Sequence, residues 1–123
     1  MSKTYKVIVY ENGSKEWWLN GKLHREDGSA IECADGTKEW YLNGKCHRED
    51  GPAIEYADGS KEWCLDGKWH REDGPAIEGG GYKAWYLNGE KLTKAEFMKR
   101  TNSRNGKIVE IDGKKYKLTE VKG

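Results

Sequence analysis

The segment Gly36–Glu55, GTKEWYLNGKCHREDGPAIE, decides the fold because the chain repeats it. Nearly the same letters occur at residues 13–32, GSKEWWLNGKLHREDGSAIE, and at residues 59–78, GSKEWCLDGKWHREDGPAIE. A fourth, incomplete copy, GYKAWYLNGEKL, occupies residues 81–92 and comes one residue early. Similarity at a fixed period indicates a repeat architecture in which neighbouring units stack on one another. The sequence therefore predicts four stacked units.

Each unit contains two turn signals, and the segments between them have the length of strands. In the second unit the Asn43-Gly44 pair is typical of a two-residue β-hairpin turn, which needs positive φ at both positions. The second turn signal falls at Asn12-Gly13, Asp35-Gly36 and Asp58-Gly59. After Glu55 a three-residue loop is favoured, because it places this carboxylate opposite Lys61. Short strands with tight turns indicate an elongated antiparallel β-hairpin sheet.

The turn at Asn43-Gly44 also fixes the expected register of its hairpin. Counting outward from the turn places Glu39 opposite Arg48, and both charges disappear together in the fourth unit, at Ala84 and Thr93. Opposite charges that face each other across a strand pair stabilise a sheet. The sequence therefore predicts three cross-strand ion pairs: Glu16–Arg25, Glu39–Arg48 and Glu62–Arg71.

The C-terminal part departs from the repeat and divides into two pieces. Thr93 and Glu96 have the spacing of a capping box, which predicts a short helix at about 94–101 that covers the end of the sheet. Asp112-Gly113 marks a last hairpin. The chain is thus predicted to be all-β, with hairpin repeats at 1–92, a capping helix and linker at 93–104, and a basic hairpin at 105–123.

Charge and composition narrow the classes of function. The 22 basic and 21 acidic residues give a net charge of +1, which argues against a strongly basic nucleic-acid binder. Residues 1–90 carry 12 basic and 17 acidic side chains, whereas residues 91–123 carry 10 and 4. No apolar run approaches a membrane span, so a soluble cytoplasmic protein is expected. The predicted basic patch consists of Lys107, Lys114, Lys115 and Lys117.

The repeat resembles the MORN-repeat class over about residues 6–92. The matching letters are Tyr56-Ala57-Asp58-Gly59 followed by the segment Trp63–His70, WCLDGKWH. In this chain Arg-Glu-Asp separates the histidine from the next glycine, so the units form a MORN-like variant. The HREDGPAIE-type repeat and the ending EIDGKKYKLTEV are also similar to small bacteriophage open reading frames. That resemblance implies a phage accessory protein.

The residues that recur in every unit are interpreted as structural. Equivalent histidines are expected about 9–10 Å apart, which is too far for one metal ion to bind them together. No pair of carboxylates is marked as unequal, as acid–base catalysis requires, so neither an enzyme nor a metal site is predicted. The cysteines replace Tyr, Leu or Trp, which indicates small apolar side chains, and no cofactor is expected. The predicted structural residues are Trp17, Trp40, Trp63, Trp85, His24, His47 and His70.

The residues that vary between units are free to contact a partner. By the hairpin register they form a stripe along one face of the sheet, and aromatic side chains of this kind are common interface anchors. The alternative is that the C-terminal helix, the last hairpin or a second copy of the chain covers the stripe. The predicted protein-binding residues are Trp18, Tyr41, Trp69 and Tyr86.

These observations together predict a non-catalytic protein-binding repeat module. The phage resemblance implies that it binds and inhibits a host defence protein or complex, as anti-CRISPR proteins do. A self-associating structural or assembly module, including a homodimer, is the alternative. A nucleic-acid binder that uses the basic C-terminal hairpin is a further alternative, which the acidic repeat body argues against.

Overall fold

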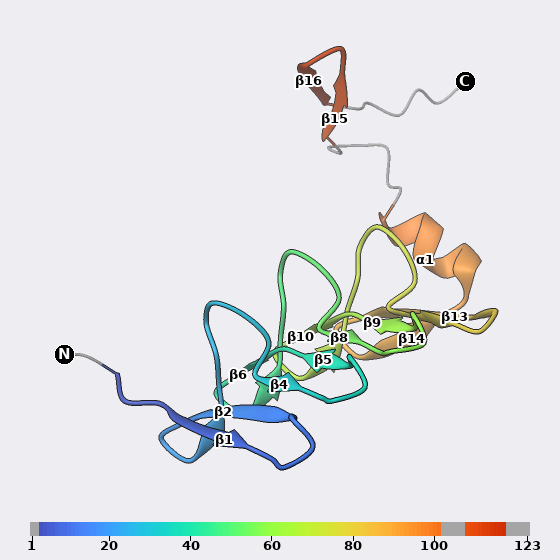
Figure 1. The fold of residues 1–123 in the computed structure, drawn as a ribbon. Helices are drawn as coiled ribbons and strands as arrows, with labels where there is room; N and C mark the ends of the chain where they lie inside the picture. Colours follow the sequence, from blue (N-terminus) through green and yellow to red (C-terminus); the bar gives the residue numbers. More distant parts are fainter. Residues whose placement is uncertain (1–2, 102–107, 118–123) are drawn as a thin grey trace, which may run out of the picture.

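The computed structural model describes residues 3–101 and 108–117, which form short antiparallel strands and one helix. The predicted all-β fold class is confirmed. The central ten-stranded sheet is open and elongated, because each unit adds strands beside the unit before it (Figure 1). Its order is β1-β2-β4-β5-β8-β9-β12-β13-β14, with β3 paired to β2. The elements are β1 Lys6–Val9, β2 Lys15–Leu19, β3 Lys22–Leu23, β4 Ile31–Glu32, β5 Lys38–Glu39, β6 Tyr41–Leu42, β7 Lys45–Cys46, β8 Ile54–Glu55, β9 Lys61–Glu62, β10 Cys64–Leu65, β11 Lys68–Trp69, β12 Ile77–Gly79, β13 Tyr82–Leu87, β14 Glu90–Leu92, α1 Lys94–Thr101, β15 Ile108–Ile111 and β16 Lys114–Lys117.

The Asn-Gly hairpins form as the sequence predicts. In the second unit Asn43 and Gly44 have φ values of 51° and 79°, which is the mirror-image turn that Asn and Gly tolerate best. This turn pairs Tyr41 of β6 with Cys46 of β7, so the predicted register next to the turn is confirmed.

The three-residue loop after Glu55 is also confirmed. Glu55 lies opposite Lys61, and the backbone N–H of Tyr56 donates to the carbonyl of Ser60 at 2.9 Å. Gly59 closes the loop with a φ of 91°, a conformation that glycine adopts without a steric penalty. Glu55 is therefore kept away from a second carboxylate.

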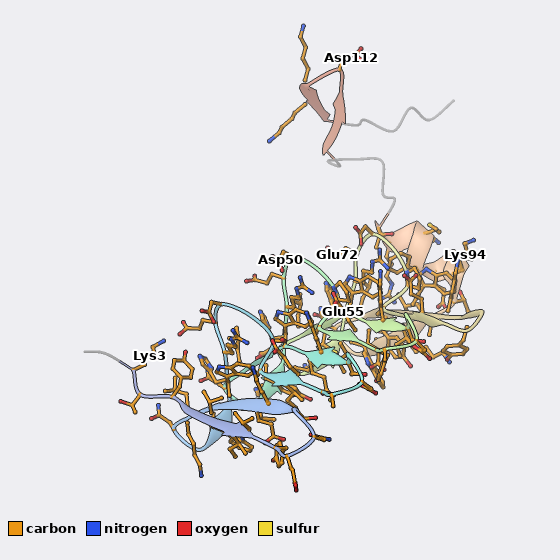
Figure 2. The ribbon with its side chains drawn as sticks, viewed as in Figure 1. Lys3, Asp50, Glu55, Glu72, Lys94 and Asp112 are labelled. Atoms are coloured by element: carbon orange, nitrogen blue, oxygen red, sulfur yellow. The ribbon has the colours of Figure 1, made fainter. Side chains whose placement is uncertain are left out.

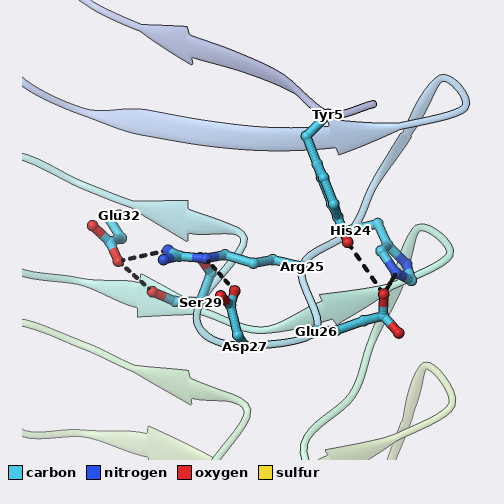
Figure 3. A network of polar contacts seen from close by, with 7 residues as sticks. All are labelled: Tyr5, His24, Arg25, Glu26, Asp27, Ser29 and Glu32. Carbon is cyan, nitrogen blue, oxygen red and sulfur yellow. Dashed lines mark hydrogen bonds and ion pairs between the residues drawn. The ribbon is translucent and has the colours of Figure 1, made fainter. Parts of the chain in front are cut away.

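The HRED loops, residues 24–28, 47–51 and 70–74, rise from one face of the sheet (Figure 1). In the first loop the Nε of Arg25 donates to Asp27 at 3.1 Å (Figure 3). Its Nη1 donates to the Ser29 carbonyl at 3.0 Å, and the guanidinium lies 3.9 Å from the centre of the Trp17 ring. A Cβ on Gly28 would lie only 3.0 Å from this guanidinium. Each loop is therefore wrapped around one arginine. In the same way, the Cζ of Arg48 lies 3.9 Å from the centre of the Trp40 ring, and the Cζ of Arg71 lies 3.7 Å from the centre of the Trp63 ring.

The predicted cross-strand ion pairs are wrong. The Arg48 Nη1 donates to Glu55 Oε2 at 2.9 Å, whereas Glu39 lies opposite an isoleucine on each neighbouring strand. The pairing of the hairpin ends at the histidine: the His47 N–H donates to the Trp40 carbonyl, but the Arg48 N–H donates to the Cys64 carbonyl of the next unit. A count from the Asn-Gly turn therefore does not reach Glu39. The pairs that do not form are Glu16–Arg25, Glu39–Arg48 and Glu62–Arg71. Each arginine forms ion pairs with two other carboxylates instead: Arg25 with Asp27 and Glu32, Arg48 with Asp50 and Glu55, and Arg71 with Asp73 and Glu78.

Each histidine joins its unit to the next one. The Nδ1 of His24 accepts a hydrogen bond of 2.8 Å from the backbone N–H of Asn43, and the adjacent Gly44 N–H donates to the Leu23 carbonyl at 2.8 Å. The other ring nitrogen of His24, Nε2, lies 3.6 Å from the Glu26 carboxylate of the same loop (Figure 3). The equivalent acceptors are the Nδ1 atoms of His47 and His70, which face the backbone N–H groups of Asp66 and Asn88.

Helix α1 begins with the predicted capping box. The Thr93 hydroxyl accepts from the Glu96 N–H at 3.1 Å, and the Glu96 carboxylate accepts from the Thr93 N–H at 2.9 Å. The carboxylate of Glu96 has a lowered pKa because of this backbone hydrogen bond. The helix contacts β13 and β14, and the buried side chains Phe97 and Leu92 lie at this end of the sheet.

Thr93→Ala is expected to lower the free energy of unfolding by about 1 kcal/mol, because it leaves the Glu96 N–H without its side-chain acceptor. Thr93→Ser keeps the hydroxyl and serves as the control, with a loss of less than half that of alanine. Urea titration of the two variants measures the difference. Equal losses would show that the threonine methyl group, and not the cap, stabilises the helix.

The last hairpin forms a separate two-stranded sheet. Strands β15 and β16 pair Val109 with Tyr116 and Glu110 with Lys115, as the Asp112-Gly113 turn predicts. Among residues 3–101 and 108–117, no helix has the length and apolar character needed to cross a membrane.

Candidate functional site

One face of the central sheet carries a row in which isoleucine alternates with glutamate. Residues directly opposite each other in a sheet point to the same face, so the strand pairs place this row across the sheet from β1 to β12. We call this face the stripe face. Trp17 follows Glu16 in the chain and therefore points to the opposite face, where the Arg25 guanidinium lies on the Trp17 ring. We call this opposite face, which carries the HRED loops, the loop face. The members of the row, in spatial order, are Ile8, Glu16, Ile31, Glu39, Ile54, Glu62 and Ile77.

The four predicted binding residues all lie on the stripe face. Trp69 and Tyr86 are neighbours, with ring centres 5.0 Å apart and planes tilted by 48°. Trp69 is 39% exposed, while Trp18, Tyr41 and Tyr86 are half-buried. The structure thus distributes these aromatic side chains over all four units instead of gathering them in one pocket. Their cross-strand partners are Leu23 for Trp18, Cys46 for Tyr41, Cys64 for Trp69 and Lys91 for Tyr86.

Aromatic donors bind the carboxylates of the central row. The Tyr41 hydroxyl donates to Glu39 at 2.8 Å, and Glu62 accepts from the Tyr56 hydroxyl at 2.6 Å and from the Trp69 Nε1 at 2.9 Å. Burial and the hydrogen bond to Glu39 raise the pKa of Tyr41, and the hydrogen bond to Glu62 raises that of Tyr56. The tyrosines therefore remain neutral donors. Glu16 is bound in the same way by Tyr10 and Trp18.

Sequence reasoning missed two exposed tyrosines and the glutamate row. Tyr10 and Tyr56 stand at a position where the other units have Cys33 and Gly79, and this variation was a signal for a contact surface. The glutamates gave no such signal, because they recur in three units and their charges were assigned to the predicted ion pairs. Their location on the stripe face becomes clear only from the strand pairing.

Helix α1 does not cover the stripe face. Lys94 at the start of the helix lies over the Trp85 ring, 6.0 Å from its centre, and Trp85 points to the opposite face from Tyr86. The helix therefore packs on the loop face, beside the third HRED loop. Figure 2 shows Asp50 and Glu72 on these loops, raised above the sheet, with Lys94 at the helix end. Of the alternatives from the sequence, a second copy remains a candidate cover for the stripe face.

The predicted structural residues lie on the loop face and between the units. Trp17, Trp40 and Trp63 carry an arginine each, and the three histidines accept hydrogen bonds from the next unit. Within the described part of the chain, no group of three or more His, Cys, Asp or Glu side chains is arranged to hold a metal ion. Cys46 and Cys64 are free thiols on the stripe face, and their mutual hydrogen bond raises the pKa of Cys46.

The predicted basic patch is described only in part. Lys114 and Lys115 are exposed beside the turn of the last hairpin. Lys117 belongs to β16, and Lys107 lies outside the described residues. These observations do not bring the four lysines together into one site.

The stripe face thus combines aromatic rings, isoleucines and carboxylates on an open sheet. The chain matches no protein-family model, no curated protein and no solved structure. The function is therefore argued from the chemistry of this face.

Proposed function

We propose that the chain is a non-catalytic protein-binding repeat module and that the stripe face is its contact surface. The observation that carries the proposal is Trp69, which is 39% exposed although the units do not need a tryptophan at this position. The equivalent residues are Leu23, Cys46 and Lys91, three side chains of different size and polarity. An exposed Trp beside Tyr86 is typical of an interface anchor.

The resemblance to MORN-like repeats and to small bacteriophage proteins extends this proposal. It supports a phage-encoded protein that works in the host cytoplasm without a cofactor. Its partner is then a host protein or complex, such as a nuclease or an effector complex of a defence system. Inhibition follows if the bound module blocks a surface that the host protein needs.

Trp69→Ala and Tyr41→Ala are each expected to weaken partner binding about 30-fold, because truncation of an aromatic anchor typically costs about 2 kcal/mol. The partner is first captured from a bacterial lysate, then purified and titrated with each variant by calorimetry. Val9→Ala is the control, since Val9 is 63% exposed but lies on the loop face opposite Lys15. A Trp69→Ala variant that binds as well as the wild type contradicts the proposal.

A second candidate function, self-association, is supported by the free edge of β1. This strand ends the central sheet, and Val7 and Val9 are 46% and 63% exposed. Val7 occupies the position of Ala30, Ala53 and Ala76, which the preceding unit buries completely. An edge of this kind can pair with another chain. A homo-oligomer in light scattering that Val9→Lys dissociates would favour this function over the first.

A further inference from the structure

The carboxylates of the stripe face have no cation of their own. Among residues 3–101 and 108–117, no lysine or arginine forms an ion pair with Glu16, Glu39 or Glu62. Their hydrogen-bond donors are neutral tyrosine hydroxyls and tryptophan N–H groups. Lys6 and Lys91 lie on this face at its two ends, opposite Trp18 and Tyr86, but neither forms an ion pair with the three glutamates. The arginines are used elsewhere: Arg48, for example, lies on the loop face with Asp50 and Glu55. The stripe face is therefore an apolar surface with a row of carboxylates that form no ion pair within the described residues.

This row determines which chemistry can cover the face. Each carboxylate is half-buried and is flanked by isoleucines; Glu39, for example, lies between Ile31 and Ile54. Covering it with an apolar partner would remove its remaining water, and an unpaired buried charge is strongly unfavourable. A partner that covers the aromatic residues must therefore bring positive charges to the same places. Arginine and lysine also pack favourably on the faces of Trp and Tyr rings.

The distance between successive glutamates of the row indicates which backbone conformation the partner segment has. Successive glutamates are two strands apart, which corresponds to about 9.6 Å at the usual strand spacing of about 4.8 Å. A polyproline II helix has three residues per turn and rises about 9.3 Å per turn, so every third side chain of such a segment points the same way at nearly this distance. Proline rings in this conformation commonly dock on surfaces lined by Trp and Tyr.

We infer that the stripe face binds a polyproline II segment of a partner protein that carries arginine or lysine at every third residue. This inference rests on the proposed protein-binding function and specifies its partner. The cations pair with Glu16, Glu39 and Glu62, and the residues between them pack on aromatic rings such as Trp69 and Tyr86. The segment runs along the sheet, across the strands.

Synthetic peptides test the inference with the full-length chain. The probe is four repeats of Arg-Pro-Pro, titrated by calorimetry at low and at physiological salt. Four repeats of Arg-Pro-Pro-Pro carry the same charge at the wrong period, and four repeats of Glu-Pro-Pro carry the opposite charge. The first peptide is expected to bind at least about tenfold more tightly than the second, and the third is expected not to bind. Equal binding of the two arginine peptides, or no binding of either, overturns the inference.

Matched variants locate the binding on the stripe face. Glu39→Gln keeps an acceptor for Tyr41 but removes the charge, and it is expected to weaken binding of the Arg-Pro-Pro peptide about tenfold. Glu72→Gln makes the same charge change on an exposed HRED loop and is expected to leave binding within about twofold. Thermal melts show whether each variant is folded. An equal loss in both variants would show general charge attraction and overturn the inference.

The outcomes separate this inference from the proposed function. If Trp69→Ala removes the captured partner while Glu39→Gln and Glu62→Gln retain it, the stripe face binds protein but the partner is not basic. If the wild type forms a dimer that Glu39→Gln dissociates and the Arg-Pro-Pro peptide does not compete with, the occupant is a second copy. Either result overturns the inference that a cationic polyproline II segment binds the stripe face. Competition between the peptide and the captured partner supports both proposals.

Discussion

Trp40→Ala is expected to lower the free energy of unfolding by about 3 kcal/mol, near the lower end for buried tryptophans because Trp40 is half-buried. The ring carries the Arg48 guanidinium at 3.9 Å, so its removal also frees the HRED loop of that unit. The Trp40 backbone joins the loop to the sheet through the Ala53 carbonyl at 2.8 Å and the His47 N–H at 3.0 Å. Since each unit packs only on its neighbours, one weakened unit lowers the stability of the array.

Trp69→Ala is the matched control for Trp40→Ala, because it removes the same side chain from the stripe face. Trp69 is more exposed, and no arginine of an HRED loop lies on its ring as Arg48 lies on Trp40, so its loss is expected to cost less than half as much stability. Guanidinium titration of the two variants with circular dichroism gives both values. Equal midpoints would show that Trp69 belongs to the packed structure, and the proposed contact surface would then lose its main support.

The turns and helix could be predicted because their signals are local. Asn43-Gly44 adopts the positive φ angles that its residue types favour, and Thr93 with Glu96 forms the cap that their spacing indicates. The loop between Glu55 and Lys61 followed from avoiding two facing carboxylates. In each case a few neighbouring residues decide the conformation, so no knowledge of distant contacts was needed.

The partners of the charged residues could not be predicted, because they depend on where strands end. The joint loss of Glu and Arg at Ala84 and Thr93 suggested that the two residues touch. The structure gives separate reasons: the fourth unit has no HRED loop to need an arginine, and Ala84 has no isoleucine strand on its outer side. Variation between units revealed the aromatic stripe, whereas the invariant glutamates beside it required the strand pairing.

Arg48→Ala is expected to lower the free energy of unfolding by about 2–3 kcal/mol, because a charged group that makes several hydrogen bonds is removed from the centre of a loop. The Arg48 side chain is only 23% exposed, donates to the Pro52 carbonyl at 3.0 Å and to Glu55 at 2.9 Å, and lies on Trp40. Arg48→Lys keeps the charge but not the planar group with several donors. It is expected to lose most of the same stability.

A double-mutant cycle with Gly51→Ala tests whether Arg48 stabilises the protein by organising its HRED loop. A Cβ on Gly51 would lie 3.1 Å from the Cζ of Arg48, and the φ of Gly51 is not in the left-handed region. Alanine therefore strains the contact with the guanidinium but not the backbone, at an expected cost of about 1–2 kcal/mol. In an Arg48→Ala background that contact is gone, so the same change should cost less than about 0.5 kcal/mol. An equal cost in both backgrounds would mean that the loop backbone itself requires glycine and that the arginine does not organise the loop.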